Sequence, residues 1–343
     1  MQKVSIVGLG LIGASIGLGL QKWATDDGQR KSVLEISGFD VAIEHQNYAK
    51  KIKAVDRTEW NLGDAIDDAD VIIIATPVTS IRDVMEIVSD RAPQNAIVTD
   101  TGSTKSKVME WADELLPTSM NFIGGHPMAG KAVSIEGAEA TLFKGATWCV
   151  SPSVNATDES VQTVLGIVSA LEAEPRFIDP HEHDGFVGAV SHLPFMLSIA
   201  LMRSVASDSS WKELCQLTSS GFRDVSRLSG GDPKMHRDIC ATNQDNVIRW
   251  IDSAVDNLNN MREMIADGSD EAMEQLLQEM DAAQHAHAQW VTSARDGRMM
   301  DEPESEVMST SVGEQMQQML FGNLFRRKPK VGNEQDRKNG QNQ

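Results

Sequence analysis

Short apolar runs alternate with amphipathic segments along the first half of the chain. The runs are rich in Val and Ile, and the segments between them place apolar residues at the spacing of one helix face. This alternation is typical of a parallel sheet covered by helices. The predicted strands are Lys3–Val7, Leu34–Phe39, Val71–Ala75, Ala96–Thr99, Phe122–Ile123 and Thr147–Val150, with Arg176–Ile178 as an edge, and the predicted helices include Ile81–Ser89, Lys105–Leu116 and Glu159–Ala173.

Beyond Pro180 the β-rich runs stop and helical periodicity takes over. It extends over Asp184–Ser207, Trp211–Ser219, Arg237–Ala266 and Ser269–Ala294. The pattern predicts a Rossmann-type doubly wound α/β domain over residues 1–180 and an all-helical domain over residues 181–295. Residues 296–343 are first rich in Met, Gln and Ser and then basic, so we expect a largely disordered tail.

A glycine motif follows the first predicted strand. Gly8, Gly10 and Gly13 form GxGxxG and open a predicted helix near Leu11. The first glycine permits a tight turn, the second lets the backbone approach a pyrophosphate, and the third allows close packing of helix on strand. The backbone N–H groups of Leu11 and Ile12, at the helix N-terminus, would face the phosphates. We therefore predict a dinucleotide site.

Asp40 ends the second predicted strand. A carboxylate there accepts hydrogen bonds from both ribose hydroxyls of NAD and repels a 2'-phosphate, so NAD is the predicted cofactor. The gap from Gly13 is longer than usual because Asp26–Lys31 is a polar insertion. The alternative is a glycine-rich turn beside a solvated aspartate.

The ends of the third and fourth predicted strands carry further polar residues. Thr76 and Pro77 follow one strand and Asp100 the other, where doubly wound sheets place ligand contacts, so we expect them to face the nicotinamide. Ser103 could hydrogen-bond a substrate alcohol or cap the helix that begins near Lys105.

His126 lies in Gly124–Gly130, a stretch of glycines and proline at a predicted strand end. Histidine titrates near neutrality, so it can take a proton from an alcohol while hydride leaves the same carbon. A structural histidine is the alternative.

Three more histidines, His181, His183 and His192, lie near the start of the helical region. Their spacing does not match a metal site, and we predict no metal; a polar network between domains or a substrate contact fits better. Arg223 and Arg227 lie in a segment predicted to join two helices. A guanidinium pairs with a carboxylate in a bidentate manner, so these two could hold an anionic substrate; otherwise they are solvated loop residues.

The net charge of −19, from 50 acidic and 31 basic residues, bears on which partners the protein can bind. Such a charge repels nucleic acid and anionic membranes, so neither is an expected partner, and an anionic substrate needs a local basic pocket. The three cysteines are widely spaced, which argues against disulfides. We read no targeting or membrane segment and expect a cytoplasmic protein.

Together these stretches resemble the prephenate and arogenate dehydrogenases, from Val4 to about Ala294. The most specific matches are Gly8–Gly13, Asp100–Lys105, Gly124–Gly130, Ser191–Pro194 and Gly221–Arg227, in family order. The resemblance implies a Rossmann domain followed by a helical dimerisation domain, a homodimer, and an active site in the cleft between the domains.

The resemblance also implies roles. His126 resembles the histidine that takes the hydroxyl proton, Ser103 the serine that orients that hydroxyl, and Arg227 the arginine that holds a substrate carboxylate. His183 and His192 match supporting histidines near the cleft. NAD would take hydride from the ring carbon that bears the hydroxyl, and loss of the ring carboxylate as carbon dioxide would restore aromaticity.

The choice of substrate is open at this stage. Prephenate would give 4-hydroxyphenylpyruvate and arogenate would give tyrosine. Lys131–Ser134 and Phe195 depart from some prephenate-using relatives, while Gly130–Phe143 and Ser220–Arg227 look closer to arogenate-using members. Two more distant alternatives are a hydroxyacid dehydrogenase, which usually relies on a lysine in its helical domain, and a non-catalytic dinucleotide-binding regulatory protein.

Overall fold

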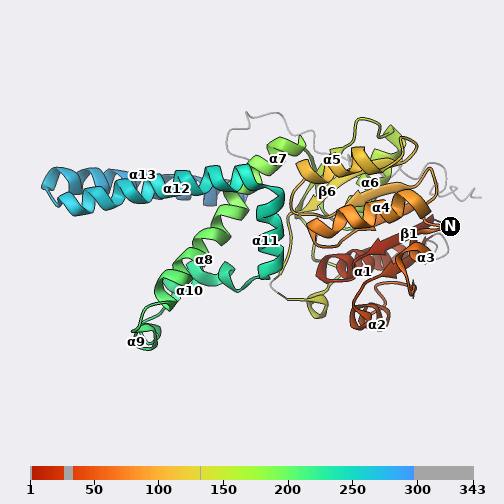
Figure 1. The fold of residues 1–343 in the computed structure, drawn as a ribbon, viewed down its shortest axis with the longest axis horizontal. Coiled ribbons are helices and arrows are strands. Elements are labelled where there is room, and N and C mark those ends of the chain that lie inside the picture. Colours follow the sequence, from red (N-terminus) through yellow and green to blue (C-terminus); the bar gives the residue numbers. More distant parts are fainter. Residues whose placement is uncertain (1, 27–33, 132, 297–343) are drawn as a thin grey trace, which may run out of the picture. The chain divides into compact units, whose positions relative to one another are not determined.

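An eight-stranded sheet occupies the first half of the computed structural model, which describes residues 2–26, 34–131 and 133–296 (Figure 1). Within these residues the strand order is β3-β2-β1-β4-β5-β6-β7-β8. Most of the predicted insertion and tail, residues 27–31 and 297–343, lies outside the described residues. The strands are β1 (Gln2–Val7), β2 (Leu34–Phe39), β3 (Arg57–Thr58), β4 (Val71–Ile74), β5 (Ile97–Asp100), β6 (Asn121–Pro127), β7 (Thr147–Pro152) and β8 (Glu174–Phe177).

The strand order changes direction at β1: β2 and β3 follow on one side of it, and β4 and β5 on the other. β1 pairs in parallel with β2 on one side and β4 on the other, so the carboxyl ends of all three meet at one edge of the sheet. Every residue of β4 is buried, as expected of a parallel strand covered on both faces. The predicted Rossmann-type sheet is confirmed, and its switch point lies at the glycine motif.

One strand pairing differs from the predicted parallel sheet. β7 runs antiparallel to β6, while β8 is parallel to β7. A parallel return needs a crossover connection, usually a full helix, and the chain between β6 and β7 holds only the short 3-10 turn η3 (Ile135–Gly137) among its described residues. The antiparallel pairing extends β6 through Pro127, well past the predicted end at Ile123.

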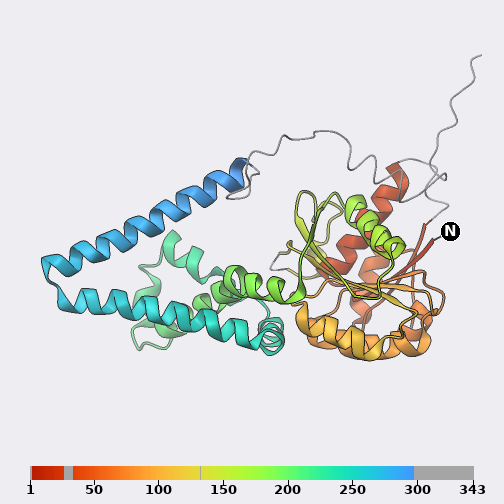
Figure 2. The same cartoon turned by 90° about the horizontal axis from the view of Figure 1, so that it is seen from above.

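Helices cover both faces of the sheet. α1 (Leu11–Asp26) and α6 (Asp158–Ala170) lie on one face, and α4 (Ile81–Arg91) and α5 (Ser106–Leu115) on the other (Figure 2). α3 (Leu62–Ile66) packs beside α4, and side chains from α3, α4, α5 and the central strands form a continuous apolar core on that face. α2 (Ile43–Lys51), α3 and β3 were not predicted, because they are short and α2 buries only Gln46 and Ala49.

The second half of the described chain is helical, as predicted. The first stretch comprises α7 (Pro180–Val187), the π-helical turn η4 (Gly188–His192) and α8 (Leu193–Ala206). Pro194 has no N–H for the carbonyl four residues earlier, and the wide turn before it accommodates that gap. The remaining elements are α9 (Trp211–Cys215), α10 (Ser220–Ser226), η5 (Arg227–Gly230), α11 (Pro233–Thr242), α12 (Gln244–Asp267) and α13 (Asp270–Asp296).

Two predictions in this region were wrong. The segment expected to join two helices, Gly221–Arg227, is itself the helix α10 running into η5, whose Ser229 N–H donates to Ser198 Oγ of α8. The helix expected over Arg237–Ala266 is two helices, broken at Asn243, whose backbone is non-helical and whose side chain is buried.

The stretch Pro180–Ala206 is long and apolar enough to cross a membrane, with a mean hydropathy of 1.7 over its most apolar window, which the sequence analysis did not predict. Length and composition are weak evidence, because core helices of soluble proteins meet the same criterion. Three of its ionisable residues, His183, Asp184 and His192, are buried and contact groups of the sheet region and of the α11–α12 junction. These contacts support packing of that part of the stretch against the rest of the chain.

Hydroxyl contacts also connect the sheet to α11. Thr79 Oγ1, in the 3-10 turn after β4, donates to Asp238 Oδ2 at 2.7 Å, and Thr104 Oγ1 donates to Thr242 Oγ1 at 2.9 Å. Thr79 and Thr104 both follow the carboxyl ends of strands, β4 and β5. The helical region therefore borders the edge of the sheet where ligands bind in this type of fold.

Candidate active site

The glycine turn after β1 has the geometry of a dinucleotide site. Gly8 has a φ of +96°, and a Cβ there would lie 2.5 Å from the Ala75 carbonyl oxygen. A Cβ on Gly13 would lie 1.9 Å from the Gly8 carbonyl oxygen. A Cβ on Gly10 would meet no heavy atom within 4 Å, so that side of the turn is open. Packing requires the first and third glycines, while the second leaves the backbone accessible to a phosphate, which fits NAD.

Asp40 lies at the end of β2 with its carboxylate fixed by the backbone. Leu9 N–H donates to Oδ2 at 2.7 Å and Ala42 N–H donates to Oδ1 at 2.8 Å. A carboxylate has about four lone-pair sites, and Oδ1, with Ala42 as its one partner among the described residues, can still accept a hydroxyl proton. His45, which was not predicted as a site residue, places Nδ1 3.3 Å from Oδ2. The arrangement fits the predicted contact with ribose hydroxyls.

The other predicted cofactor contacts divide into two kinds. Thr76 Oγ1, after β4, is buried and has no hydrogen-bond partner among the described residues, and Pro77 beside it is exposed. The Asp100 side chain, by contrast, is fully buried; it forms an ion pair with Lys105 Nζ and accepts hydrogen bonds from the N–H groups of Gly102 and Gly125. We therefore correct the prediction for Asp100: its carboxylate neutralises a buried lysine and does not face a cofactor.

Ser103 is half-buried in the loop before α5, and its predicted role as a helix cap was wrong. The helix begins at Ser106, and the residue before it, Lys105, makes no capping bond with its side chain. The carboxylate of Asp184, from α7, accepts the N–H of Lys105 at 2.7 Å and the N–H of Ser106 at 2.9 Å instead. The other predicted role of Ser103, contact with a substrate hydroxyl, stays a prediction.

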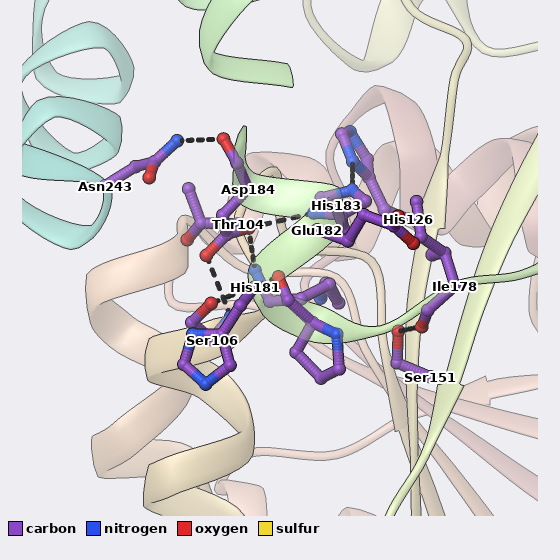
Figure 3. A network of polar contacts seen from close by, with 12 residues as sticks. Thr104, Ser106, His126, Ser151, Ile178, His181, Glu182, His183, Asp184 and Asn243 are labelled. Atoms are coloured by element: carbon purple, nitrogen blue, oxygen red, sulfur yellow. Dashed lines mark hydrogen bonds and ion pairs between the residues drawn. The ribbon is translucent and has the colours of Figure 1, made fainter. Parts of the chain in front are cut away.

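His126 lies near the carboxyl end of β6, at the same edge of the sheet as the glycine turn. It is half-buried, and its Nδ1 is 2.9 Å from Nε2 of His183, with the two rings edge to face (Figure 3). Burial, and then the neighbouring His183, Lys105 and His192, lower the pKa of His126 well below its usual value. The ring is therefore neutral at physiological pH and has one nitrogen able to accept a proton.

His183 is buried and uses both ring nitrogens inside the protein. Its Nδ1 is 2.8 Å from Asp184 Oδ1, and its Nε2 faces His126. Burial alone would raise the pKa of Asp184, but hydrogen bonds from His183, Lys105 and Ser106 hold that pKa below its usual value. These contacts argue against the predicted contact of His183 with substrate, because neither nitrogen is free to make one.

His192 is fully buried at the end of the π-helical turn. Asn243 Nδ2 donates to the Asp184 carbonyl oxygen at 2.8 Å and lies 3.1 Å from His192 Nδ1. Because that carbonyl can only accept, the amide NH₂ group faces both partners, and His192 Nδ1 is an acceptor. Burial lowers the pKa of His192 to about 4, so the neutral ring carries its proton on Nε2. That nitrogen has no partner among the described residues, so it can donate to a ligand oxygen.

Arg223 and Arg227 are exposed on α10 and η5. Within the described chain neither forms an ion pair or side-chain hydrogen bond, and no contact joins either to His126. Both side chains are therefore available to an anion, and their predicted role stays a prediction.

Several members of the network were not predicted as site residues. Lys105, Asp184 and Asn243 come from the start of α5, from α7 and from the break between α11 and α12, and their contacts span 51 to 79 residues of sequence. Lys105 lies in the Asp100–Lys105 match and Asp184 follows His183 directly, so for these two the sequence signal was their place beside predicted site residues. Among the described residues no group of three or more His, Cys, Asp or Glu side chains is arranged to hold a metal ion.

Two family models match the chain. "Prephenate dehydrogenase, nucleotide-binding domain" covers residues 26–175 and "Prephenate dehydrogenase, dimerization domain" covers residues 179–281. The first match begins after the glycine turn, so the turn is an observation independent of it.

Individual relatives and solved structures point the same way. A prephenate dehydrogenase of Bacillus subtilis is 30% identical over 76% of this chain and 69% of its own length, and one of Lactococcus lactis is 32% identical over 81% and 75%. A prephenate dehydrogenase of Aquifex aeolicus, solved with hydroxyphenyl propionate and NAD⁺, has a TM-score of 0.75 at 27% identity, covering 84% of this chain and 98% of its own. An arogenate dehydrogenase of Synechocystis has a TM-score of 0.67 at 29% identity, covering 83% and 100%.

Proposed function

The chain belongs to the prephenate dehydrogenase family, and from this premise we propose that it catalyses the NAD-dependent oxidative decarboxylation of prephenate to 4-hydroxyphenylpyruvate. The observation that carries the proposal is the placement of His126: a neutral, half-buried histidine stands at the same sheet edge as a glycine turn whose second glycine is open. NAD bound at that turn would supply the hydride acceptor.

The residues around His126 supply the proton chemistry. As hydride leaves the ring carbon, the hydroxyl proton becomes acidic, and a neutral histidine of lowered pKa suffices to accept it. Ser103 is proposed to orient the same hydroxyl. His192 Nε2–H is proposed to donate to a substrate oxygen, because it is a buried donor without a protein partner. Arg227 and Arg223 are proposed to hold a substrate carboxylate.

The decarboxylation step needs little from the protein. Once the ring carbon is oxidised to a ketone, the electrons of the breaking bond to the ring carboxylate move into the dienone, and carbon dioxide leaves as the ring becomes aromatic. The protein therefore has to position the ring for hydride transfer and remove one proton.

Arogenate is the second candidate substrate, favoured by the likeness to an arogenate dehydrogenase. The departures at Lys131 and Ser134 bear little on the choice between prephenate and arogenate. Lys131 pairs with Glu139, and Ser134 Oγ lies 3.4 Å from His45 Nε2, beside Asp40. These two positions lie at the proposed cofactor side of the site.

Initial rates with both substrates and both cofactors test the proposal. We expect NADH to form with prephenate and 4-hydroxyphenylpyruvate to accumulate, with a lower kcat/KM for arogenate and for NADP. A higher kcat/KM for arogenate would reassign the substrate. NAD binding without turnover of either compound would contradict the proposed activity and favour a regulatory protein.

We also propose a homodimer and a cytoplasmic location. The match to the dimerization-domain model and the exposed apolar side chains of α12 and α13 support the homodimer. The cysteines support a reducing compartment, because Cys149, Cys215 and Cys240 are all unpaired.

A further inference from the structure

We infer that Asp184 is a positioning residue that acts through His183 to fix which nitrogen of His126 carries the proton. The inference rests on the proposed function and extends it to the residues behind the base. It starts from a continuous line of contacts: Asp184 Oδ1 to His183 Nδ1 at 2.8 Å, and His183 Nε2 to His126 Nδ1 at 2.9 Å (Figure 3).

The Asp184 carboxylate is held as a charged acceptor. It receives the N–H groups of Lys105 and Ser106 at the N-terminus of α5, where the helix dipole also favours a negative charge. The Asp184 side chain is 1% exposed, so these bonds are shielded from water. An ionised carboxylate cannot donate, and it therefore requires a proton on His183 Nδ1.

The direction of the remaining bond follows. With its one ring proton on Nδ1, His183 presents a lone pair at Nε2, and the proton between the rings then belongs to His126 Nδ1. His126 Nε2 is then unprotonated and is the nitrogen that can accept the substrate proton. When His126 becomes an imidazolium, the same line of contacts connects its charge to the Asp184 carboxylate.

Asp184 also joins two parts of the chain. Its carboxylate caps α5, which follows the loop of Ser103, while its backbone carbonyl accepts from Asn243. The same residue thus orients the base and connects α7 to the sheet region. The remaining groups near His126 are Lys105 before α5, His192 in the π-helical turn, and Cys149, its cross-strand partner on β7.

Nitrogen NMR of the full-length protein labelled with ¹⁵N at histidine tests the inference without reference to activity. Couplings between ring nitrogens and carbon-bound protons show which nitrogen is protonated, and loss of one signal set in His126→Asn identifies His126. We expect a proton on Nδ1 and none on Nε2 in the wild type. A proton on Nε2 would overturn the inference.

Three variants provide the kinetic test. His183→Gln leaves Asp184 to cap α5 and should lower kcat by roughly 10- to 100-fold with little change in KM for either substrate. Because His183 connects the His126 ring to the Asp184 carboxylate, which stabilises the imidazolium, the acid limb of kcat/KM should also move to lower pH. Asp184→Asn should lower kcat similarly and also reduce thermal stability, because the Lys105 and Ser106 N–H groups use both carboxylate oxygens and an amide keeps only one acceptor.

His181→Gln is the matched control, because His181 is exposed on the same helix and its ring makes none of these contacts. It should keep the wild-type kcat, pH profile and melting temperature. Wild-type kcat and an unmoved acid limb in both His183→Gln and Asp184→Asn would overturn the inference. If wild-type protein turned over neither substrate, the proposed function would fail, while the nitrogen spectra would still report on the proton.

Discussion

At the level of single residues, the surroundings of each side chain in the site set its protonation state and its hydrogen-bonding role. His126 is an unprotonated base because it is buried near other basic groups, and His192 is a neutral donor because Asn243 occupies its other nitrogen. Asp184 stays charged because hydrogen bonds from His183 and from two backbone N–H groups compensate for its burial. Each effect depends on partners supplied by another element.

His126→Asn tests the proposed base. Asparagine keeps much of the size and polarity of the side chain but cannot accept the proton, so we expect kcat to fall by on the order of 100-fold or more with a modest change in substrate affinity. Steady-state kinetics and a binding titration with a product analogue measure the two effects. A variant with near-normal turnover would remove His126 from this role.

The pH profile of kcat/KM follows from the lowered pKa of His126. Protonation abolishes the base, and a pKa below the ordinary value of 6.5 means that protonation occurs only at more acidic pH. Activity should therefore persist as the pH falls through 6.5, and the acid limb should lie below that value. NAD affinity measured over the same range serves as the control, and an acid limb at or above pH 6.5 would contradict the assignment.

Arg227→Ala tests the predicted carboxylate contact. Loss of the guanidinium should raise KM for prephenate by roughly 10-fold or more and change kcat less, because the interaction exists before and during the reaction. Arg227→Lys should recover only part of the affinity, since an ammonium cannot make the bidentate contact. An unchanged KM in Arg227→Ala would reject the assignment.

At the scale of elements, capping and breaks decide where the site residues lie. Asp179 accepts the N–H groups of His181 and Glu182 at 2.8 and 3.1 Å, and Pro180 occupies the first turn, so α7 begins where the sheet ends. That start sets His183 and Asp184 on the buried side of the helix. Likewise, the side chain of Asn243, at the break between α11 and α12, is buried and reaches His192.

Asp179→Ala should weaken the start of α7. Loss of the cap costs about 1 kcal/mol, which should lower the melting temperature by a few degrees. Asp179→Asn is the matched control, because asparagine caps as well as aspartate and should melt near the wild type. Equal melting temperatures for the alanine variant and the wild type would show that the cap contributes nothing.

At the scale of the whole molecule, the long helices α12 and α13 leave apolar side chains without cover. Leu258, Ile265, Leu277 and Met280 are 58, 61, 51 and 53% exposed. The two helices pack against each other and are joined at Gly268, whose φ of +67° is the left-handed cap typical of glycine. So much exposed apolar area on adjoining helices is typical of an interface between subunits.

The homodimer is testable by sedimentation equilibrium. We expect twice the chain mass of 37.5 kDa at micromolar concentration, and a shift toward monomer in the double variant Leu258→Asp with Leu277→Asp. Val154→Asp is the control, since Val154 is 96% exposed in the sheet region. A wild-type monomer, or a double variant that stays fully dimeric, would contradict this surface as the interface.

Local patterns predicted most of the sheet and the long helices, because burial on two faces or on one stripe imposes a periodicity that is visible in the sequence. The predictions for β2, α1 and α4 were close for this reason. α10 was missed because Gly221 and its polar neighbours resemble a loop, and β7 was predicted in the wrong direction because strand direction leaves no mark on a short apolar run. The antiparallel pairing had to be read from the structure.

The Rossmann-type order, the dinucleotide turn and the candidate base were all visible in the amino-acid sequence, because they depend on glycine spacing and on residue types close together in the chain. The ion pair of Asp100 with Lys105, the cap that Asp184 provides to a distant helix and the position of His183 behind His126 became visible in the folded chain alone. The charge and proton position of a buried group depend on its nearest partners, and here those partners come from segments far apart in the sequence.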